Sequence, residues 1–292
     1  MRIVDAFRSR DFAAIGYISA WKVLGLLPVE LVRRGFEFVA TLVARKHDAV
    51  RQLSRNLGRV VDKPEAEVAP AMRSYARYWA EAFCLPSFDR ARLWERLDQN
   101  VQGRRHLRAS LDQGKGVVLT LPHSGNWDMA GVWLVGYAGQ FTTVAERLKP
   151  EVLFDAFVEF REGLGFEVLA HTGGKQAPFD RLQEVLREGG IVCLLGERDL
   201  KGRGVPTSFF GEATTFPAGP AQLALSTGAA LHTVSSYFTP SGWSFEISSP
   251  LEVDDLDSTV ARIARNFEDD IAAHPEDWHM LQSLWLADRK RH

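Results

Sequence analysis

The sequence predicts an α/β fold in which a central sheet, mixed but largely parallel, is flanked by helices. Short apolar runs with the length and composition of buried strands recur through the second half of the chain. Amphipathic segments long enough to form helices lie between these runs. Strands that alternate with helices along a chain usually pair in parallel, with the helices covering the sheet.

The elements follow from this alternation. The expected strands cover residues 117–121, 141–145, 166–170, 191–195, 229–238 and 243–248. The expected helices in the same half cover residues 126–137, 150–164, 176–188, 218–227 and 258–274. Residues 46–100 are helical on either side of a loop at KPEAEVAP, in which a helix starts after Pro64, and residues 101–115 form one more helix that ends among glycines. We expect VPTSFFGEATTFPAGPAQLA to be a turn, whose Phe209, Phe210 and Phe216 either line an apolar slot or fill the core. Since no repeat or linker interrupts the chain, we expect one domain over 1–292, with its α/β core at 116–292.

The N-terminal region predicts a pair of apolar helices that meet at Pro28. Charged residues interrupt residues 12–45 too often for the roughly 18 uncharged residues that a transmembrane helix needs. Aromatic and basic residues interleave there, a composition typical of helices that lie in the membrane interface. We therefore expect residues 1–45 to contact a membrane without spanning it. An ordinary amphipathic pair packed on the core is the alternative.

Composition restricts the partners of the chain and the state of its cysteines. The 292 residues carry a net charge of −2, which argues against a nucleic-acid partner. Cys84 and Cys193 both lie among apolar neighbours, as expected for buried free thiols in a reducing compartment.

Residues 116–137 are the most informative stretch, because a strand there leads into a helix through the polar turn HSGNWD. His123 and Asp128 are five residues apart, and on one continuous helix they would point about 140° away from each other. They meet only if His123 lies in the turn, where Gly125 allows a tight bend. A carboxylate on one ring nitrogen would leave the other free to act as a base. A structural histidine is the alternative.

Further polar residues follow neighbouring strands. Glu197, Arg198 and Asp199 come directly after residues 191–195, and Glu146 follows residues 141–145. Parallel strands end at a common edge, so we expect these side chains near His123 in an acid–base or substrate-orienting site. A solvated charged turn is the alternative. A metal held by His123 and Asp128 is the other possibility, but no HExxH motif or cysteine cluster supports it, and we expect no metal.

The motifs resemble those of the glycerolipid and lipid A acyltransferase superfamily. HSGNWD is similar to its H-x-x-x-x-D block. GKGVVLTLPHSGNWDMAG, ERLKP, FREGLGF, LLGERDLKGRG and VPTSFFGEATTFPAGPAQLALSTGAAL follow in the order and spacing of the bacterial lipid A acyltransferase-like branch. RNLGRV, SYARYWAEAF and HPEDWHMLQSLW are similar to it too. The resemblance thus covers nearly the whole chain, and it is strongest to the actinobacterial group that acylates phosphatidylinositol mannosides.

The resemblance implies roles for the site residues. His123 is the expected general base and Asp128 its orienting partner, while Glu197 lies near the histidine, with Asp199 as the alternative carboxylate. Arg161, in the second motif, would bind a substrate phosphate or carbonyl. Glu146 and Arg198 are the remaining substrate-binding candidates.

The implied reaction is direct acyl transfer. A long-chain acyl-CoA, most simply palmitoyl-CoA, would donate to a sugar hydroxyl of a glycolipid, a mannose of phosphatidylinositol mannosides, without a further cofactor. The enzyme would be peripheral, on the inner leaflet at the cytoplasmic face of the plasma membrane. The alternatives are a lipid A-type or lysophospholipid acyltransferase, an acyl-CoA thioesterase, and a lipid-binding member without catalysis. Acyl chain length, the acylated hydroxyl and the oligomeric state are not predicted.

Overall fold

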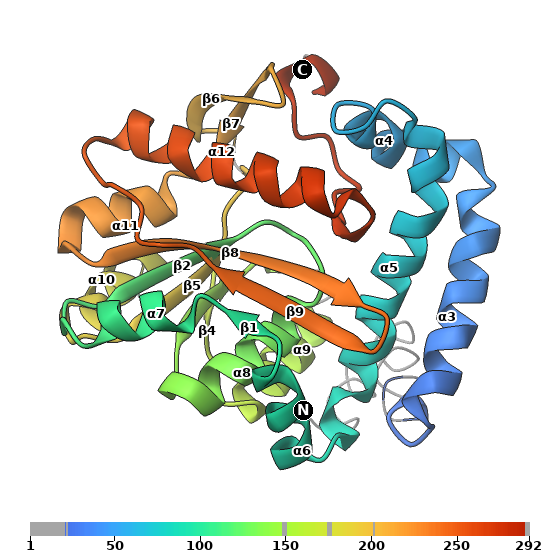
Figure 1. The fold of residues 1–292 in the computed structure, drawn as a ribbon, viewed down its shortest axis with the longest axis horizontal. Helices are drawn as coiled ribbons and strands as arrows, with labels where there is room; N and C mark the ends of the chain where they lie inside the picture. Colours follow the sequence, from blue (N-terminus) through green and yellow to red (C-terminus); the bar gives the residue numbers. More distant parts are fainter. Residues whose placement is uncertain (1–20, 22, 148–150, 174–176, 201, 290–292) are drawn as a thin grey trace.

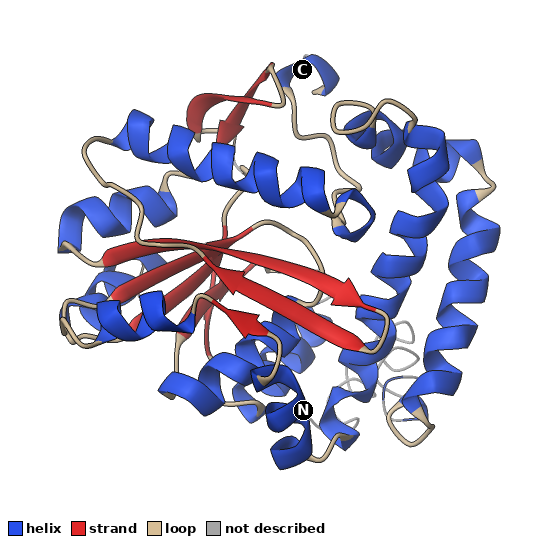
Figure 2. Ribbon diagram, in the orientation of Figure 1, coloured by secondary structure: helices blue, strands red, loops and turns tan. Residues whose placement is uncertain are grey.

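A seven-stranded sheet forms the centre of the molecule (Figures 1 and 2). The computed structural model describes residues 21, 23–147, 151–173, 177–200 and 202–289. The strand order is β1-β9-β8-β2-β5-β3-β4. Only the β8–β9 pairing is antiparallel within this sheet, since every other neighbouring pair is parallel. The prediction of a largely parallel α/β sheet is therefore confirmed.

The strands of the sheet are β1 (Val101–Gln102), β2 (Val117–Leu121), β3 (Thr142–Ala145), β4 (Glu167–Ala170), β5 (Ile191–Leu195), β8 (Ala230–Thr239) and β9 (Gly242–Ile247). The main helices are α3 (Val29–Ala44), α4 (His47–Leu57), α5 (Pro64–Cys84), α6 (Arg90–Asp98), α7 (Arg104–Leu111), α8 (Trp127–Ala138), α9 (Glu151–Gly163), α10 (Pro178–Arg187), α11 (Gly219–Thr227) and α12 (Leu256–Ala273). From residue 117 onward, every predicted helix and strand is present within two residues of its expected bounds.

Two local predictions were wrong, and a third was right only in part. Residues 101–115 contain β1 and then α7, because β1 pairs with β9 and Gly103, at φ +72°, turns the chain against Ile247. Residues 205–216, expected as a turn, form an antiparallel hairpin of β6 (Val205–Phe209) and β7 (Glu212–Phe216). The helix start expected at Pro64 is confirmed, but the loop predicted at KPEAEVAP ends there, because α5 begins at Pro64 and continues through Pro70.

Two apolar cores lie on opposite faces of the sheet. On β2, Val118 packs into the core formed by α10, α11 and α12, whereas Leu119 and Leu121 pack into the core formed with α6 and α8. Successive strand residues point to opposite faces, so both faces of β2 are covered. Figure 2 shows α12 on one side of the sheet and α8 on the other.

A separate helical layer of α3, α4 and α5 stands beside the sheet, on the right in Figure 1. Pro28 immediately precedes α3, as predicted. The outer side of this region exposes large apolar side chains: Leu26, Leu31, Phe38, Val39 and Leu42. Among the described helices, none is long and apolar enough to cross a bilayer. Residues 1–20 of the expected interfacial pair lie outside the described residues, and membrane contact stays a prediction.

Asp270 predicts how stability depends on pH. Burial, together with the nearby charges of Glu246 and Asp269, raises its pKa to about 7, whereas an unfolded Asp ionises near pH 4. Between pH 4 and pH 7 the folded chain therefore binds more protons than the unfolded chain, and stability falls as the pH rises. We expect Asp270→Asn to remove this loss, raising the free energy of unfolding at pH 8 by about 4 kcal/mol with little change at pH 4.

Urea unfolding at the two pH values measures this effect. Asp62→Asn, at an exposed aspartate, is the control and should change neither value. An equal gain from Asp270→Asn at both pH values would show that ionisation of Asp270 is not its cause.

Candidate active site

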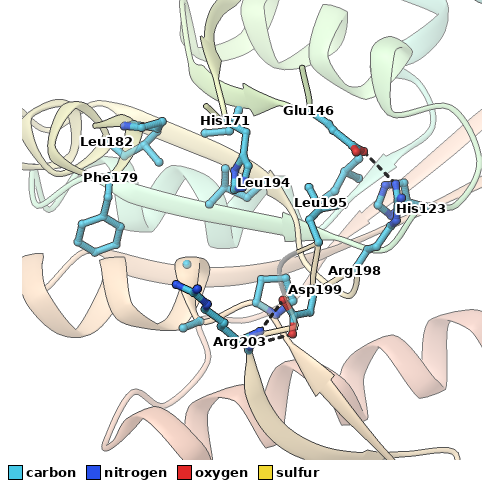
Figure 3. Close-up of a pocket in the computed structure, with 17 residues that line it drawn as sticks. His123, Glu146, His171, Phe179, Leu182, Leu194, Leu195, Arg198, Asp199 and Arg203 are labelled. Carbon is cyan, nitrogen blue, oxygen red and sulfur yellow. Dashed lines mark hydrogen bonds and ion pairs between the residues drawn. The ribbon is translucent and has the colours of Figure 1, made fainter. Parts of the chain in front are cut away.

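The polar residues singled out from the sequence converge at the carboxyl edge of the parallel strands. His123 follows β2, Glu197 to Asp199 follow β5, and Glu146 follows β3. Figure 3 shows side chains from these loops around one pocket. The expectation that they share an edge is confirmed.

The turn that carries His123 is fixed by its backbone. Gly125 has φ +57°, and a Cβ atom there would lie 2.5 Å from the carbonyl oxygen of Ser236, so only glycine fits. Asn126 caps α8, its side chain accepting a hydrogen bond from the N–H of Met129 at 3.1 Å. Its amide nitrogen donates to Glu81 at 2.7 Å. The predicted strand–turn–helix is therefore a rigid connection that holds His123 just before the helix.

A buried carboxylate holds the imidazole. Glu197 Oε1 lies 2.9 Å from His123 Nδ1 and also accepts the backbone N–H of His123 at 2.6 Å. Glu197 is fully buried, while the His123 side chain is 22% exposed. The carboxylate bond assigns the proton to Nδ1 and leaves Nε2, which has no hydrogen bond to a described residue, to accept a proton.

Asp128 has different partners from those expected. Its Oδ1 accepts from Arg161 Nε at 2.8 Å, and its Oδ2 accepts from the Tyr78 hydroxyl at 3.0 Å. The expected direct hydrogen bond between Asp128 and His123 does not form, because the first turn of α8 directs the carboxylate to Arg161 on α9. Glu197 occupies the position on the imidazole that the sequence had suggested for Asp128.

The Asp128 carboxylate keeps the buried Arg161 side chain positively charged. Burial acts to lower the pKa of Arg161, but the adjacent Asp128 carboxylate outweighs it and raises that pKa. Burial, followed by the Asp128 charge, raises the pKa of Tyr78 well above its ordinary value. Arg161 is thus a permanent cation, with 18% of its side chain exposed. Tyr78 was missed by the sequence analysis, because nothing local marks a tyrosine on α5 as a partner of α8.

The remaining candidates divide between the pocket rim and the neighbouring loop. Arg198 and Glu146 form an ion pair at 3.1 Å and both line the pocket. Asp199 accepts from the N–H of Gly204 at 2.7 Å and from the Thr215 hydroxyl at 2.8 Å. Asp199 therefore braces the loop before β6, and Glu197 is the carboxylate at the histidine.

An apolar pocket of about 440 Å³ leads away from His123. Its lining includes Val144, Phe179, Leu182, Leu194, Leu195 and Ala218. Phe209 and Phe216, weighed from the sequence as pocket residues or core, are 0% and 1% exposed and belong to the core. The residues from α10 were not anticipated, since a helix face gives no sign of which cavity it borders.

The C-terminal segment 277–279 supports the catalytic turn. The backbone N–H of Gly125 donates to the carbonyl of Asp277 at 2.9 Å, and that of His279 donates to the carbonyl of His123 at 2.8 Å. Ser74 on α5 bonds both Asp277 and His279. Burial, and then the nearby His123, lowers the pKa of His279 to about 3, so it is neutral. No local feature of the sequence marks the contact of His279 with Ser74, which lies 205 residues earlier in the chain.

Other chemistries find little support in the described part of the chain. No group of three or more His, Cys, Asp or Glu side chains there is arranged to hold a metal ion. Cys84 and Cys193 are free thiols, and burial raises the pKa of Cys193 to about 12. Neither thiol has the lowered pKa of a nucleophile.

Comparisons with known proteins identify the family of the chain. The model of the family described as bacterial lipid A biosynthesis acyltransferase matches residues 8–287. The phosphatidylinositol mannoside acyltransferase of Mycolicibacterium smegmatis is 49% identical over 281 residues, covering 94% of this chain and 91% of the relative. That of Mycobacterium tuberculosis H37Rv is 48% identical over 279 residues, covering 93% and 88%. The chain therefore belongs to the bacterial lipid A biosynthesis acyltransferase family and is an acyltransferase.

Proposed function

We propose that this enzyme transfers a long-chain fatty acyl group from acyl-CoA to a mannose hydroxyl of phosphatidylinositol mannosides, with His123 as the general base. One observation carries the proposal: His123, held at Nδ1 by the buried Glu197, lines a largely apolar pocket. The relatives' names support the acceptor class, since both are phosphatidylinositol mannoside acyltransferases.

In the proposed reaction, Nε2 of His123 takes the proton of the acceptor hydroxyl while its oxygen attacks the thioester carbonyl. A new C–O bond forms, and the carbonyl π electrons move onto the oxygen. The tetrahedral intermediate then collapses, the C–S bond breaks, and CoA leaves as a thiolate that receives the proton from the imidazolium. Because a sugar hydroxyl is a weak acid, the base contributes about 10²–10⁴-fold to the rate.

Glu197 stabilises the imidazolium that forms during the attack. Its negative charge is buried and faces Nδ1 directly, and charges interact more strongly away from water. The oxyanion would bind the first N–H groups of α8, which have no partners inside the helix, or the Arg161 guanidinium. The Arg161 cation also suits a phosphate of either substrate.

Two surfaces of the protein suit lipid substrates. One is the pocket beside His123, and the other is the exposed face of the helical layer formed by α3, α4 and α5. The apolar lining would take hydrocarbon from the donor. The exposed apolar side chains of α3 support a peripheral position on the inner leaflet, at the cytoplasmic face of the plasma membrane, where a lipid acceptor and a cytoplasmic thioester meet.

The decisive assay supplies labelled palmitoyl-CoA together with phosphatidylinositol mannosides, lysophospholipids or lipid A precursors. Labelled phosphatidylinositol mannosides are the expected product. If only another lipid is acylated, that lipid is the acceptor and the proposed acceptor is wrong. Release of free palmitate alone would make the enzyme a thioesterase.

Replacing the proposed base tests the mechanism. We expect His123→Ala to lower kcat by about 10²–10⁴-fold, because the proton of the attacking hydroxyl then has no acceptor. The thermal midpoint should fall as well, since the buried Glu197 carboxylate loses the imidazole as a partner. Single-turnover transfer of labelled palmitate measures the effect. If His123→Ala transfers as fast as the wild type, His123 is not the base.

Two carboxamide substitutions distinguish the two carboxylates. Glu197→Gln keeps the size but removes the charge that stabilises the imidazolium, so we expect kcat to fall by about 10²-fold or more. Asp199→Asn, which acts on the loop before β6, should change kcat less than tenfold and act mainly on stability. The opposite ranking would assign the role to Asp199.

Asp128→Ala tests the ion pair that Asp128 of the H-x-x-x-x-D block forms with Arg161. Without Asp128, the buried Arg161 cation loses its carboxylate, and we expect a loss of about 3–5 kcal/mol in the free energy of unfolding. Chemical denaturation of Asp128→Ala and of the double variant Asp128→Ala/Arg161→Met measures it. The double variant should recover part of the loss. An undiminished stability in Asp128→Ala would contradict the ion pair.

A further inference from the structure

Helix α5 places a buried carboxylate, that of Glu81, against the start of α8. The Glu81 side chain is 3% exposed. Its Oε1 accepts from Arg77 Nε at 2.8 Å, and its Oε2 accepts from Asn126 Nδ2 at 2.7 Å and from Trp243 Nε1 at 2.6 Å. These donors lie on α5, at the cap of α8 and on β9. One carboxylate therefore joins three elements, and no step of the proposed reaction uses it.

The chemistry of these groups fixes the direction of the Asn126 amide. A carboxylate only accepts hydrogen bonds, whereas the N–H groups of Trp243 and of the backbone only donate. The end of the amide that faces Glu81 is therefore Nδ2, and Oδ1 accepts from the N–H of Met129 at 3.1 Å. A reversed amide would set an acceptor against Glu81 and a donor against Met129. Glu81 thus holds Asn126 in the orientation that caps α8.

The capped end of α8 is part of the site. Asn126 is three residues after His123, and Asp128, in the first turn of α8, holds Arg161. The backbone N–H of Asn126 donates to the Ser236 hydroxyl at 3.1 Å, so only the side chain of this residue is free to reorient. Loss of the cap would loosen the helix where it meets the two groups of charged residues. A displacement of about 1 Å in such a site can cost about 10²-fold in rate.

Arg77 keeps the Glu81 carboxylate itself in place. The Arg77 guanidinium donates to the carbonyl oxygens of Thr239 at 3.1 Å and Gly242 at 2.7 Å, at the turn between β8 and β9. Because Arg77 is held by that turn, it holds the carboxylate of Glu81 at a fixed place. A network in which every group has a partner is rigid, so the carboxylate is a fixed reference for the cap.

We propose that Glu81 is a positioning residue for acyl transfer. Its carboxylate sets the orientation of the Asn126 amide, and through that amide it holds the turn of His123 and the first turn of α8 in the geometry that the reaction needs. This inference rests on the proposed function, since that function gives His123 its task. It assigns to α5 a role in turnover that goes beyond support of the fold.

Reversing the polarity of the hydrogen bond tests the proposal. Glu81→Gln sets an NH₂ group among three donors, so we expect kcat to fall about tenfold to 100-fold. Asn126→Asp alone brings two carboxylates together and should lower kcat at least tenfold. In the double variant Glu81→Gln/Asn126→Asp, the new carboxamide donates to the new carboxylate, which still accepts from Met129. Its kcat should be at least fivefold above that of either single variant.

Transfer of labelled palmitate from palmitoyl-CoA to phosphatidylinositol mannosides measures these rates. The KM for palmitoyl-CoA should stay within threefold of the wild type in each variant, because Glu81 and Asn126 do not line the pocket beside His123. Hydrogen exchange followed by mass spectrometry supplies a readout without turnover. The first turn of α8 should exchange faster in Glu81→Gln and return toward the wild-type rate in the double variant.

Asp98→Asn is the matched control. Asp98 also accepts from an arginine, Arg104 at 2.8 Å, and from a tryptophan Nε1, that of Trp133 at 3.0 Å. Trp133 lies in the middle of α8, away from the cap, so Asp98→Asn should keep kcat within threefold and leave exchange at the first turn unchanged. If Glu81→Gln does not fold, Asn126→Asp carries the test, since it leaves both Glu81 and Arg77 in place.

The outcomes separate this inference from the proposed function. If Glu81→Gln keeps kcat within threefold of the wild type, or if the losses of the two single variants multiply in the double variant, Glu81 does not act through Asn126 and the inference is overturned. A loss of kcat without faster exchange at the first turn of α8 overturns it as well. If His123→Ala transfers as fast as the wild type, the proposed base is wrong, while the exchange rates still decide whether Glu81 holds the turn.

Discussion

The contact between Glu197 and His123 depends on how β2 and β5 lie side by side. The strands pair in parallel with Leu121 opposite Leu195, so both chains leave the sheet at the same level. The N–H of Gly196 then donates to the carbonyl of Leu121 at 2.9 Å. A Cβ on Gly196 would lie 2.2 Å from Thr120 Oγ1, so a side chain there would force the strands apart. One oxygen of Glu197 can therefore bond both the backbone N–H and the ring of His123. A buried carboxylate without hydrogen-bond partners costs free energy. The pairing of β2 with β5 therefore holds both His123 and Glu197 in place.

The site separates its charges into two compensated groups. Glu197 faces the imidazole, and Asp128 faces Arg161, with Tyr78 as a further donor. The first group changes charge during proton transfer, since the imidazole becomes an imidazolium. In the second group, the Arg161 guanidinium keeps its positive charge throughout the reaction. Such preorganised charges need little rearrangement when the transition state forms, which is why their packing matters as much as their identity.

Sequence reasoning located the edge of the sheet but not the pairing of side chains on it. Periodicity and strand order place His123, Glu146 and Glu197 on that edge, because parallel strands end together. The spacing of His123 and Asp128 shows only that they can meet, and it contains no information about Arg161, which lies 33 residues after Asp128 and satisfies the carboxylate instead. Likewise β1 is too short to produce a period, and its existence depends on the distant strand β9. Contacts of this range are set by the whole packing, so a single sequence gives no local sign of them.

Helix α5 links the candidate membrane surface to the chemistry. Ser74, Tyr78 and Glu81 follow one another at intervals of four and three residues, so they form one polar stripe along the helix. Each contacts a different support of the catalytic turn: Ser74 the segment 277–279, Tyr78 the Asp128 cluster, and Glu81 the cap Asn126. On another side of α5, Ala80 and Cys84 pack with Val32 of α3. Since α3 carries the exposed apolar residues, any surface that holds α3 is joined to His123 through a single rigid helix. The distance of the base from that surface is then fixed by packing, and it does not depend on a flexible linker.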